Sequence, residues 1–86
     1  MNKQDLELRL RQEGFRAECY RLDGTLPSYE GYVLTEVHGA WLVEYFERGQ
    51  TTLLARFASE DAACADFYAR LAKDTVVRPR NYHDQN

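Results

Sequence analysis

The residues best suited to chemistry in this chain are its two histidines, its two cysteines and the acid–base corner YFERGQ at residues 45–50. His38 stands in a short break between two apolar runs, and His83 lies in the polar C-terminal segment. No serine or cysteine is placed to form a nucleophile pair with either histidine. Cys64 falls on an apolar stripe with helical spacing, which predicts a buried thiol rather than a reactive one. We therefore expect no nucleophilic catalysis.

Acid–base, phosphate and metal chemistry find no better support. Glu44 and Glu47 are three residues apart on a strand and its turn, which would put them on opposite faces of a regular strand. The glycines are all isolated, so no glycine-rich phosphate loop is present. Cys19 and Cys64 lack the spacing of metal ligands. The prediction is a protein that is not an enzyme, with no catalytic residue, no metal and no cofactor.

Length and composition also favour a small binding module. A chain of 86 residues forms one domain, and it buries only about 60–65% of its unfolded surface, too little to surround a large cavity. No apolar run approaches the ~18 residues of a membrane span. The N-terminal segment MNKQDLELRL has no apolar core of an export signal. We expect a cytoplasmic protein with no membrane contact, in which both thiols stay free.

The charge is unevenly distributed along the chain. Residues 22–61 hold two bases against seven acids, a net charge of −5, whereas residues 1–21 and 62–86 are each +1, for a total of −3. This acidic middle segment argues against direct nucleic-acid binding, which needs clustered lysine and arginine. It favours a basic protein partner, such as a nuclease domain.

Capping residues and turn formers mark the elements that position these side chains. Asn2 and Gly14 bound one helix, and Ser59 caps a second helix whose first turn is acidic. Leu6 and Leu10 share one stripe of the first helix, with Leu8 off it. The expected elements are a helix over 3–13, an edge strand near 18–22, strands over 32–37, 40–46 and 51–57, and a helix from 59 to 73.

The lengths of the turns decide which strand residues share a face. A two-residue turn at His38-Gly39 pairs Glu36 with Trp41, Leu34 with Val43 and Tyr32 with Tyr45. A three-residue loop Glu47-Arg48-Gly49 followed by a bulge would place the next strand's apolar residues on that same face, and we expect this loop. The aromatic face is then the core and is covered by the second helix. Leu53, Ala55 and Phe57 of the next strand are expected on this same face.

The opposite sheet face is too apolar to stay in water. It would carry Val33, Leu42, Phe46 and Leu54 among polar neighbours, and monomers rarely leave large contiguous apolar patches exposed. Either the first helix or the C-terminal tail covers this face, or the face binds a partner or a second copy of the chain.

These elements predict an α+β fold with the order α-β-β-β-β-α. A three- to four-stranded antiparallel meander would pack against one or two helices. Residues 1–74 would form the single domain and residues 75–86 a polar C-terminal tail, frayed or draped over the domain.

Three segments carry a resemblance to a known family: the loop LDGTLPSY (22–29), the run WLVEYFERG (41–49) and the run FASEDAAC (57–64). Over about residues 14–74 the chain resembles small bacterial immunity proteins encoded beside polymorphic toxins, including contact-dependent inhibition systems and type VI effectors. The resemblance implies binding and neutralisation of a cognate toxin in the cytoplasm, by covering its active site or blocking substrate access.

The contact residues expected for such a partner combine apolar anchors with charges. They are Tyr29, Glu30, Leu42, Glu44, Phe46, Glu47 and Arg48. The alternative function is a homodimeric structural or regulatory module without a toxin partner, using the same apolar sheet face.

Overall fold

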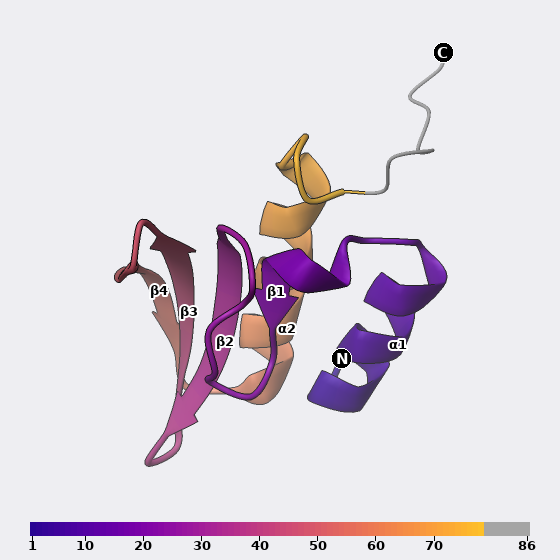
Figure 1. Cartoon of the computed structure of the whole chain (residues 1–86). Helices are drawn as coiled ribbons and strands as arrows, with labels where there is room; N and C mark the ends of the chain where they lie inside the picture. The colour runs from indigo at the N-terminus through magenta and orange to yellow at the C-terminus, as the bar shows by residue number, and fades with distance from the viewer. Residues whose placement is uncertain (79–86) are drawn as a thin grey trace.

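The fold was obtained as a computed structural model, which describes residues 1–78 (Figure 1). It has the predicted α+β class and element order, with a four-stranded sheet in the order β1-β2-β3-β4. The elements are α1 (Lys3–Gln12), the 3-10 helix η1 (Ala17–Cys19), β1 (Tyr20–Arg21), β2 (Gly31–Val37), β3 (Ala40–Glu47), β4 (Gln50–Phe57) and α2 (Glu60–Lys73).

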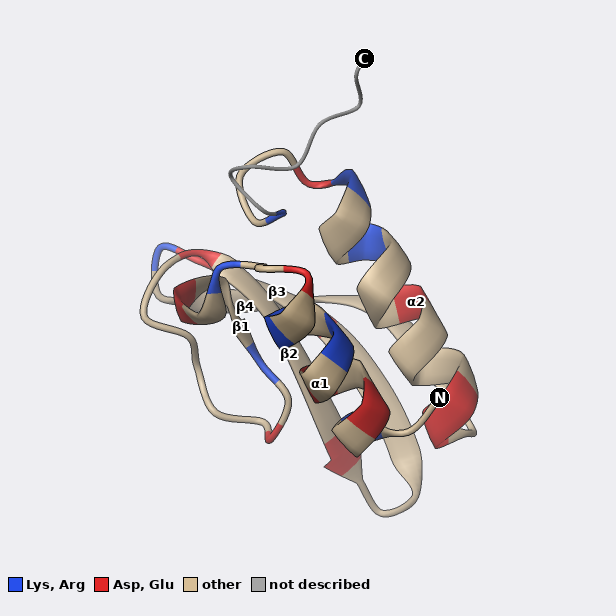
Figure 2. Cartoon of the chain, turned by 90° about the vertical axis from the view of Figure 1, so that its right-hand side faces the viewer, with Lys and Arg blue, Asp and Glu red and all other residues tan. Residues whose placement is uncertain are grey.

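Both helices begin at the caps expected from the sequence. The side chain of Asn2 accepts from the amide of Asp5 at 2.8 Å, and that of Ser59 accepts from the amide of Ala62 at 3.2 Å. These bonds satisfy amides that a helix start leaves without partners. Figure 2 shows the acidic start and basic end of α2, an arrangement that complements the helix dipole.

The β2–β3 hairpin has the predicted two-residue turn. His38 and Gly39 both have left-handed backbone angles (φ 51° and 85°), the conformation that two-residue turns of this kind require. The turn fixes the predicted pairs, which are Tyr32 with Tyr45, Leu34 with Val43 and Glu36 with Trp41. The Tyr32 and Tyr45 rings meet edge to face, with centroids 5.0 Å apart.

The β3–β4 connection differs from the prediction. The turn has two residues, Arg48-Gly49, with φ of 53° and 78°, instead of the expected three-residue loop. The change of register comes later, between Val43 and Glu44 of β3, where Leu54 of β4 is the extra residue. A bulge within the strand shifts the alternation as effectively as a longer turn does.

The position of the bulge decides which apolar residues of β4 reach the core. Ala55 and Phe57 lie opposite Val43 and Trp41, as predicted, because they follow the bulge. Leu53 precedes it and lies opposite Glu44, with 55% of its surface exposed. The prediction that Leu53 joins the core face is therefore wrong.

The first strand makes the sheet mixed. β1 pairs with β2 in parallel, Tyr20 opposite Tyr32, so the antiparallel meander is limited to β2, β3 and β4. The close approach of η1 requires a glycine at position 31, since a Cβ there would lie 1.8 Å from the carbonyl oxygen of Cys19. This glycine has no left-handed φ, so its role is steric.

Both helices lie on the same side of the sheet (Figure 1). Leu6 and Leu10 of α1 join one apolar core with Phe67 and Leu71 of α2 and with the aromatic face of the sheet, while Leu8 is exposed as expected. At their N-terminal ends the helices are joined by the Lys3 amide, which donates to Glu60 Oε2 at 2.7 Å. The first helix therefore does not cover the opposite sheet face.

The start of the expected C-terminal tail belongs to the core. Val77 is buried, and its carbonyl accepts from the amide of Arg16 at 3.1 Å. This segment packs with the helices and so also leaves the opposite sheet face free. The part of the tail beyond residue 78, including His83, lies outside the described residues.

Within residues 1–78, the opposite face is covered over β2 alone. The segment between β1 and β2 crosses there, since a Cβ on Gly24 would lie 3.4 Å from the Thr35 side chain and the Gly24 amide donates to Leu34 O at 3.1 Å. Val33 is consequently only 1% exposed. Leu42 and Phe46 of β3 remain partly exposed on the uncovered part, which we call the free face of β3 and β4.

Candidate functional site

Four of the seven predicted contact residues line one open groove at an end of the free face. They are Tyr29, Glu30, Phe46 and Arg48. The groove has a volume of about 510 Å³ and is completed by Arg16, Cys19, Ser28 and Val76. We call it the Tyr29–Arg48 groove. It draws on four segments of the chain, and only the fold brings these together.

The backbone of the fold holds these side chains in place. The amide of Tyr29 donates to Glu18 O at 3.0 Å, which ties the crossing segment to η1. Phe46 lies opposite Gly31 in the β2–β3 ladder. Arg48 occupies the first left-handed position of the β3–β4 turn, so its side chain leaves the sheet at the rim of the groove.

The charged groups of the groove have no ion-pair partner among residues 1–78. None of the four ion pairs formed within residues 1–78 includes Arg16, Arg48 or Glu30. Two guanidinium groups against one carboxylate give the lining a charge of +1. The groove is thus locally basic, although residues 22–61 as a whole are acidic.

Arg16 is the charged groove residue that the sequence did not reveal. Its Nε is the one side-chain nitrogen or oxygen in the described part of the chain that is buried without a hydrogen-bond partner. Arg16 follows the first helix and is separated from Arg48 by 31 intervening residues. No spacing or motif signals such a pairing, because it depends on how η1 packs beside β2.

The remaining predicted residues lie outside the groove. Leu42 and Glu44 alternate with Val43 along β3 and share the free face with Phe46, opposite Arg56 and Leu53 of β4. Glu47 pairs with Gln50 next to the turn and, by the same alternation, faces the other side of the sheet. The predicted set therefore divides into four groove residues, two residues of the free face and one residue apart from both.

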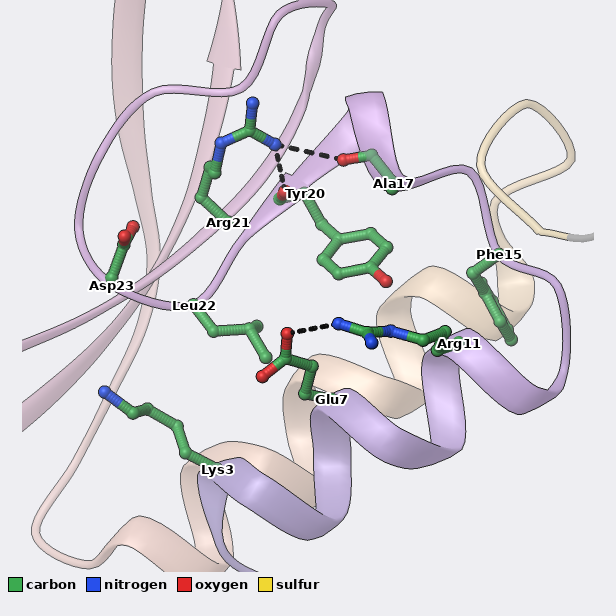
Figure 3. Close-up of a pocket in the computed structure, with 9 residues that line it drawn as sticks. All are labelled: Lys3, Glu7, Arg11, Phe15, Ala17, Tyr20, Arg21, Leu22 and Asp23. Carbon is green, nitrogen blue, oxygen red and sulfur yellow. Dashed lines mark hydrogen bonds and ion pairs between the residues drawn. The ribbon is translucent and has the colours of Figure 1, made fainter.

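A second hollow, of about 380 Å³, lies between α1 and β1 (Figure 3). Its charges are mostly satisfied within the protein. Arg11 pairs with Glu7 at 2.9 Å, and Arg21 donates to the carbonyls of Ala17 and Tyr20 at 3.0 and 2.8 Å. Burial raises the pKa of Tyr20, so its phenol remains neutral at physiological pH. This hollow offers a ligand fewer free charged groups than the groove does.

Both thiols are free, as predicted, and both are buried, although burial was predicted only for Cys64. Burial raises the pKa of Cys19, and it raises the pKa of Cys64 to about 11, so neither forms a thiolate at physiological pH. A protonated, buried thiol is a poor nucleophile. Residues 1–78 contain no cluster of histidine, cysteine and carboxylate groups able to hold a metal ion. The same residues include no helix with the length and hydrophobicity to span a membrane.

The comparisons with protein-family models, curated proteins and solved structures gave no match. The structural features of this chain that bear on binding are its free face and the Tyr29–Arg48 groove. They offer apolar area, two guanidinium groups without an ion pair in the described part of the chain, and an exposed tyrosine, which are components that protein-binding surfaces concentrate.

Proposed function

We propose that this protein is an immunity protein that binds a cognate toxin domain in the cytoplasm. It neutralises the toxin by covering its active site or blocking access of substrate. The proposal that the partner is a toxin comes from the sequence resemblance. The proposal of a binding role is supported by the Tyr29–Arg48 groove, which lies at an end of the free face of β3 and β4.

The apolar part of the proposed interface is the free face of β3 and β4. Phe46 and Leu42 lie on it, and Leu53 is 55% exposed beside them on β4. Burying these side chains against a partner would contribute about 25 cal/mol per Å² of apolar area removed from water. Tyr29 is 63% exposed and supplies a large ring with a hydroxyl tip at the end of the same surface.

Charged residues on and beside the free face would help this protein to select its partner. Glu44 lies on the free face, and it belongs to the acidic segment 22–61 that suits a basic toxin such as a nuclease. Charges around an apolar centre affect the rate of association and the rejection of wrong partners more than they affect affinity. Arg48 and Arg16 provide the opposite sign at the groove end.

The experiment is a protection assay with the product of the neighbouring toxin gene, combined with co-purification. Leu53→Asp should abolish protection and co-purification. Leu8→Asp is the matched control, because Leu8 is 56% exposed on α1, away from the free face. Thermal unfolding of both variants checks that the fold survives.

Charge reversal by Glu44→Lys should weaken protection in the same assay. Full protection by folded L53D and E44K proteins would exclude the free face as the interface. Failure of the wild-type chain to bind or neutralise the neighbouring gene product would remove the proposed function itself.

The second candidate function is a homodimeric module, and the β4 strand is the observation that favours it. β4 is eight residues long, lies at an edge of the sheet and carries exposed Leu53 and Leu54. An unprotected edge strand can pair with another chain. Sedimentation of the purified protein alone distinguishes this candidate, since a toxin-binding monomer would sediment as a monomer without its partner.

A further inference from the structure

We infer that the Tyr29–Arg48 groove is a carboxylate-binding site that takes an aspartate or glutamate side chain of the partner between Arg16 and Arg48. The identity of the molecule carrying that carboxylate rests on the proposed function. The binding chemistry of the groove rests on its own lining residues.

The first observation is the unsatisfied Arg16. Its buried Nε has no hydrogen-bond partner within residues 1–78, and its side chain lines the groove. A buried donor without an acceptor costs free energy, and more so when it belongs to a charged group. An anion in the groove would provide the missing countercharge and accept hydrogen bonds from the guanidinium.

The second observation is Arg48, which brings another guanidinium to the same groove from the β3–β4 turn. It forms no ion pair with any described residue. By contrast, the α-helical arginines Arg9, Arg11 and Arg70 are each paired with a carboxylate four residues away. The planar guanidinium group suits the two oxygens of a carboxylate, which it can bind through two parallel hydrogen bonds.

The charge of the groove selects a singly charged ligand. Glu30 is also in the lining, so the two arginines leave one net positive charge. A carboxylate neutralises this charge, whereas a phosphate dianion would exceed it and would be repelled more strongly by Glu30. Carboxylate is therefore the ligand class that the groove fits best.

The remaining side chains of the groove indicate which chemical groups of the ligand should lie next to its carboxylate. Ser28 and Tyr29 add hydroxyl groups that have no hydrogen-bond partner in the described part of the chain. Phe46 and Val76, the latter 65% exposed, add apolar surface. These groups suit an acidic side chain held on a peptide backbone, with aliphatic carbon against the apolar walls and peptide groups near the hydroxyls.

The test uses N-acetyl-L-aspartate N-methylamide as the probe and its asparagine analogue as the neutral control. The probe is titrated into the full chain while the NMR signal of the Arg16 Nε–H group is followed. We expect saturable shifts in the millimolar range with the aspartate probe and none with the asparagine analogue. Inorganic phosphate, titrated in parallel, should bind more weakly than the aspartate probe.

Variants locate the site. Arg48→Gln and Arg16→Lys should each weaken binding of the aspartate probe by roughly tenfold, measured for both variants through the backbone amide signals of Tyr29 and Glu30, because R16K lacks the Arg16 Nε–H group. Arg56→Lys is the control, because Arg56 lies on β4, lines a different hollow with His38 and forms no ion pair within residues 1–78. If R16K does not fold, R48Q alone carries the comparison, since Arg48 is an exposed turn residue.

The outcomes separate this inference from the proposed function. Equal shifts with both probes, no shift with either probe, or preferred binding of phosphate would overturn the carboxylate site, whether or not the protein protects against a toxin. Binding of the aspartate probe without any toxin protection would leave the site standing and remove the proposed function.

Discussion

The phenol oxygen of Tyr32 donates to Oδ2 of Asp74 at 2.8 Å, so a residue of the central strand β2 is hydrogen-bonded to the residue that caps the C-terminus of α2. The other oxygen of Asp74 accepts from the amides of Val76 and Val77, at 2.9 and 3.3 Å. This carboxylate therefore joins the sheet to the segment that carries Val77 into the core. It also places Val76 beside the Tyr29–Arg48 groove.

Removing the Tyr32 hydroxyl tests the strength of this connection. Tyr32→Phe should lower the free energy of unfolding by about 1–2 kcal/mol, because it removes a partly buried hydrogen bond to a charged group. Tyr45→Phe is the matched control on the same face, since the Tyr45 hydroxyl has no hydrogen-bond partner among residues 1–78. Urea unfolding measures both values, and equal losses would contradict a specific role for the Tyr32–Asp74 bond.

The buried thiol of Cys64 predicts a loss of stability in alkali. Burial raises its pKa from the ordinary 9.0 to about 11. Because the folded-state pKa is the higher one, the protonated thiol stabilises the fold fully below pH 9, and this contribution is lost as the pH rises towards 11. The effect on the free energy of unfolding should reach about 1 kcal/mol at pH 10.

Cys64→Ala isolates the contribution of this thiol. The stability difference between wild type and the C64A protein should be constant from pH 7 to pH 8 and should shrink by about 1 kcal/mol at pH 10. Urea unfolding at each pH provides the measurement. Parallel pH curves for the two proteins would show that Cys64 does not titrate as predicted.

A contact between the two helices predicts the opposite pH dependence. Tyr68 of α2 donates to Glu13 Oε1 at 2.6 Å, and Arg9 donates to Glu13 Oε2 at 2.9 Å while its guanidinium carbon lies 4.0 Å from the Tyr68 ring centre. The bond from Tyr68, followed by the bond from Arg9, lowers the pKa of Glu13 below its ordinary 4.5. Its stabilising contribution is present above pH 4.5 and is lost as the pH falls through the lowered value.

Tyr68→Phe should therefore destabilise the protein by less than about 1 kcal/mol at pH 7, since this contact is partly exposed. The difference from wild type should diminish between pH 5 and pH 3. Thermal unfolding across this range measures it. Glu7→Gln serves as a control in which only an exposed pair within α1 is removed. A Tyr68→Phe effect that does not depend on pH would assign its cost to packing alone.

Two glycines separate steric from conformational requirements. Gly31→Ala should cost about 3 kcal/mol or more, because its Cβ would overlap the Cys19 carbonyl and force β1 away from β2. Gly39→Ala should cost only about 1 kcal/mol, since nothing lies within 4 Å of its Cβ and only its left-handed φ of 85° is strained. Chemical denaturation measures the loss of unfolding free energy in each variant, and equal losses would refute the steric interpretation of Gly31.

Features that depend on neighbouring residues were predictable from the sequence. The caps Asn2 and Ser59, the buried stripe of α2 and the His38-Gly39 hairpin all follow from interactions between residues that are close along the chain. Such interactions restrict the backbone before distant segments meet. The prediction that Cys64 is unreactive also depended only on the place of this residue in an apolar stripe.

The sequence predicted that the alternation of side chains shifts by one residue before the end of β4, but it did not predict where the shift occurs. The apolar residues Ala55 and Phe57 require one extra residue somewhere between them and Glu47, and a longer turn or a later bulge would satisfy that requirement equally. The two solutions differ in the position of Leu53, which a longer turn would place on the core face and a bulge at Leu54 places on the free face. Tertiary packing determines which of the two forms. Alternation along one strand contains no information on that choice.

The sequence by itself thus determined the α+β order, the helix boundaries and one hairpin register, because these depend on backbone preferences and short-range hydrogen bonds. Only the tertiary structure decided the parallel pairing of β1, the shared side of α1 and α2, and the presence of Arg16, Tyr29 and Arg48 in the lining of one groove. These features depend on long-range packing. Because Gly31 has no side chain, η1 can approach β2, and this approach places Arg16 and Cys19 in one wall of the groove.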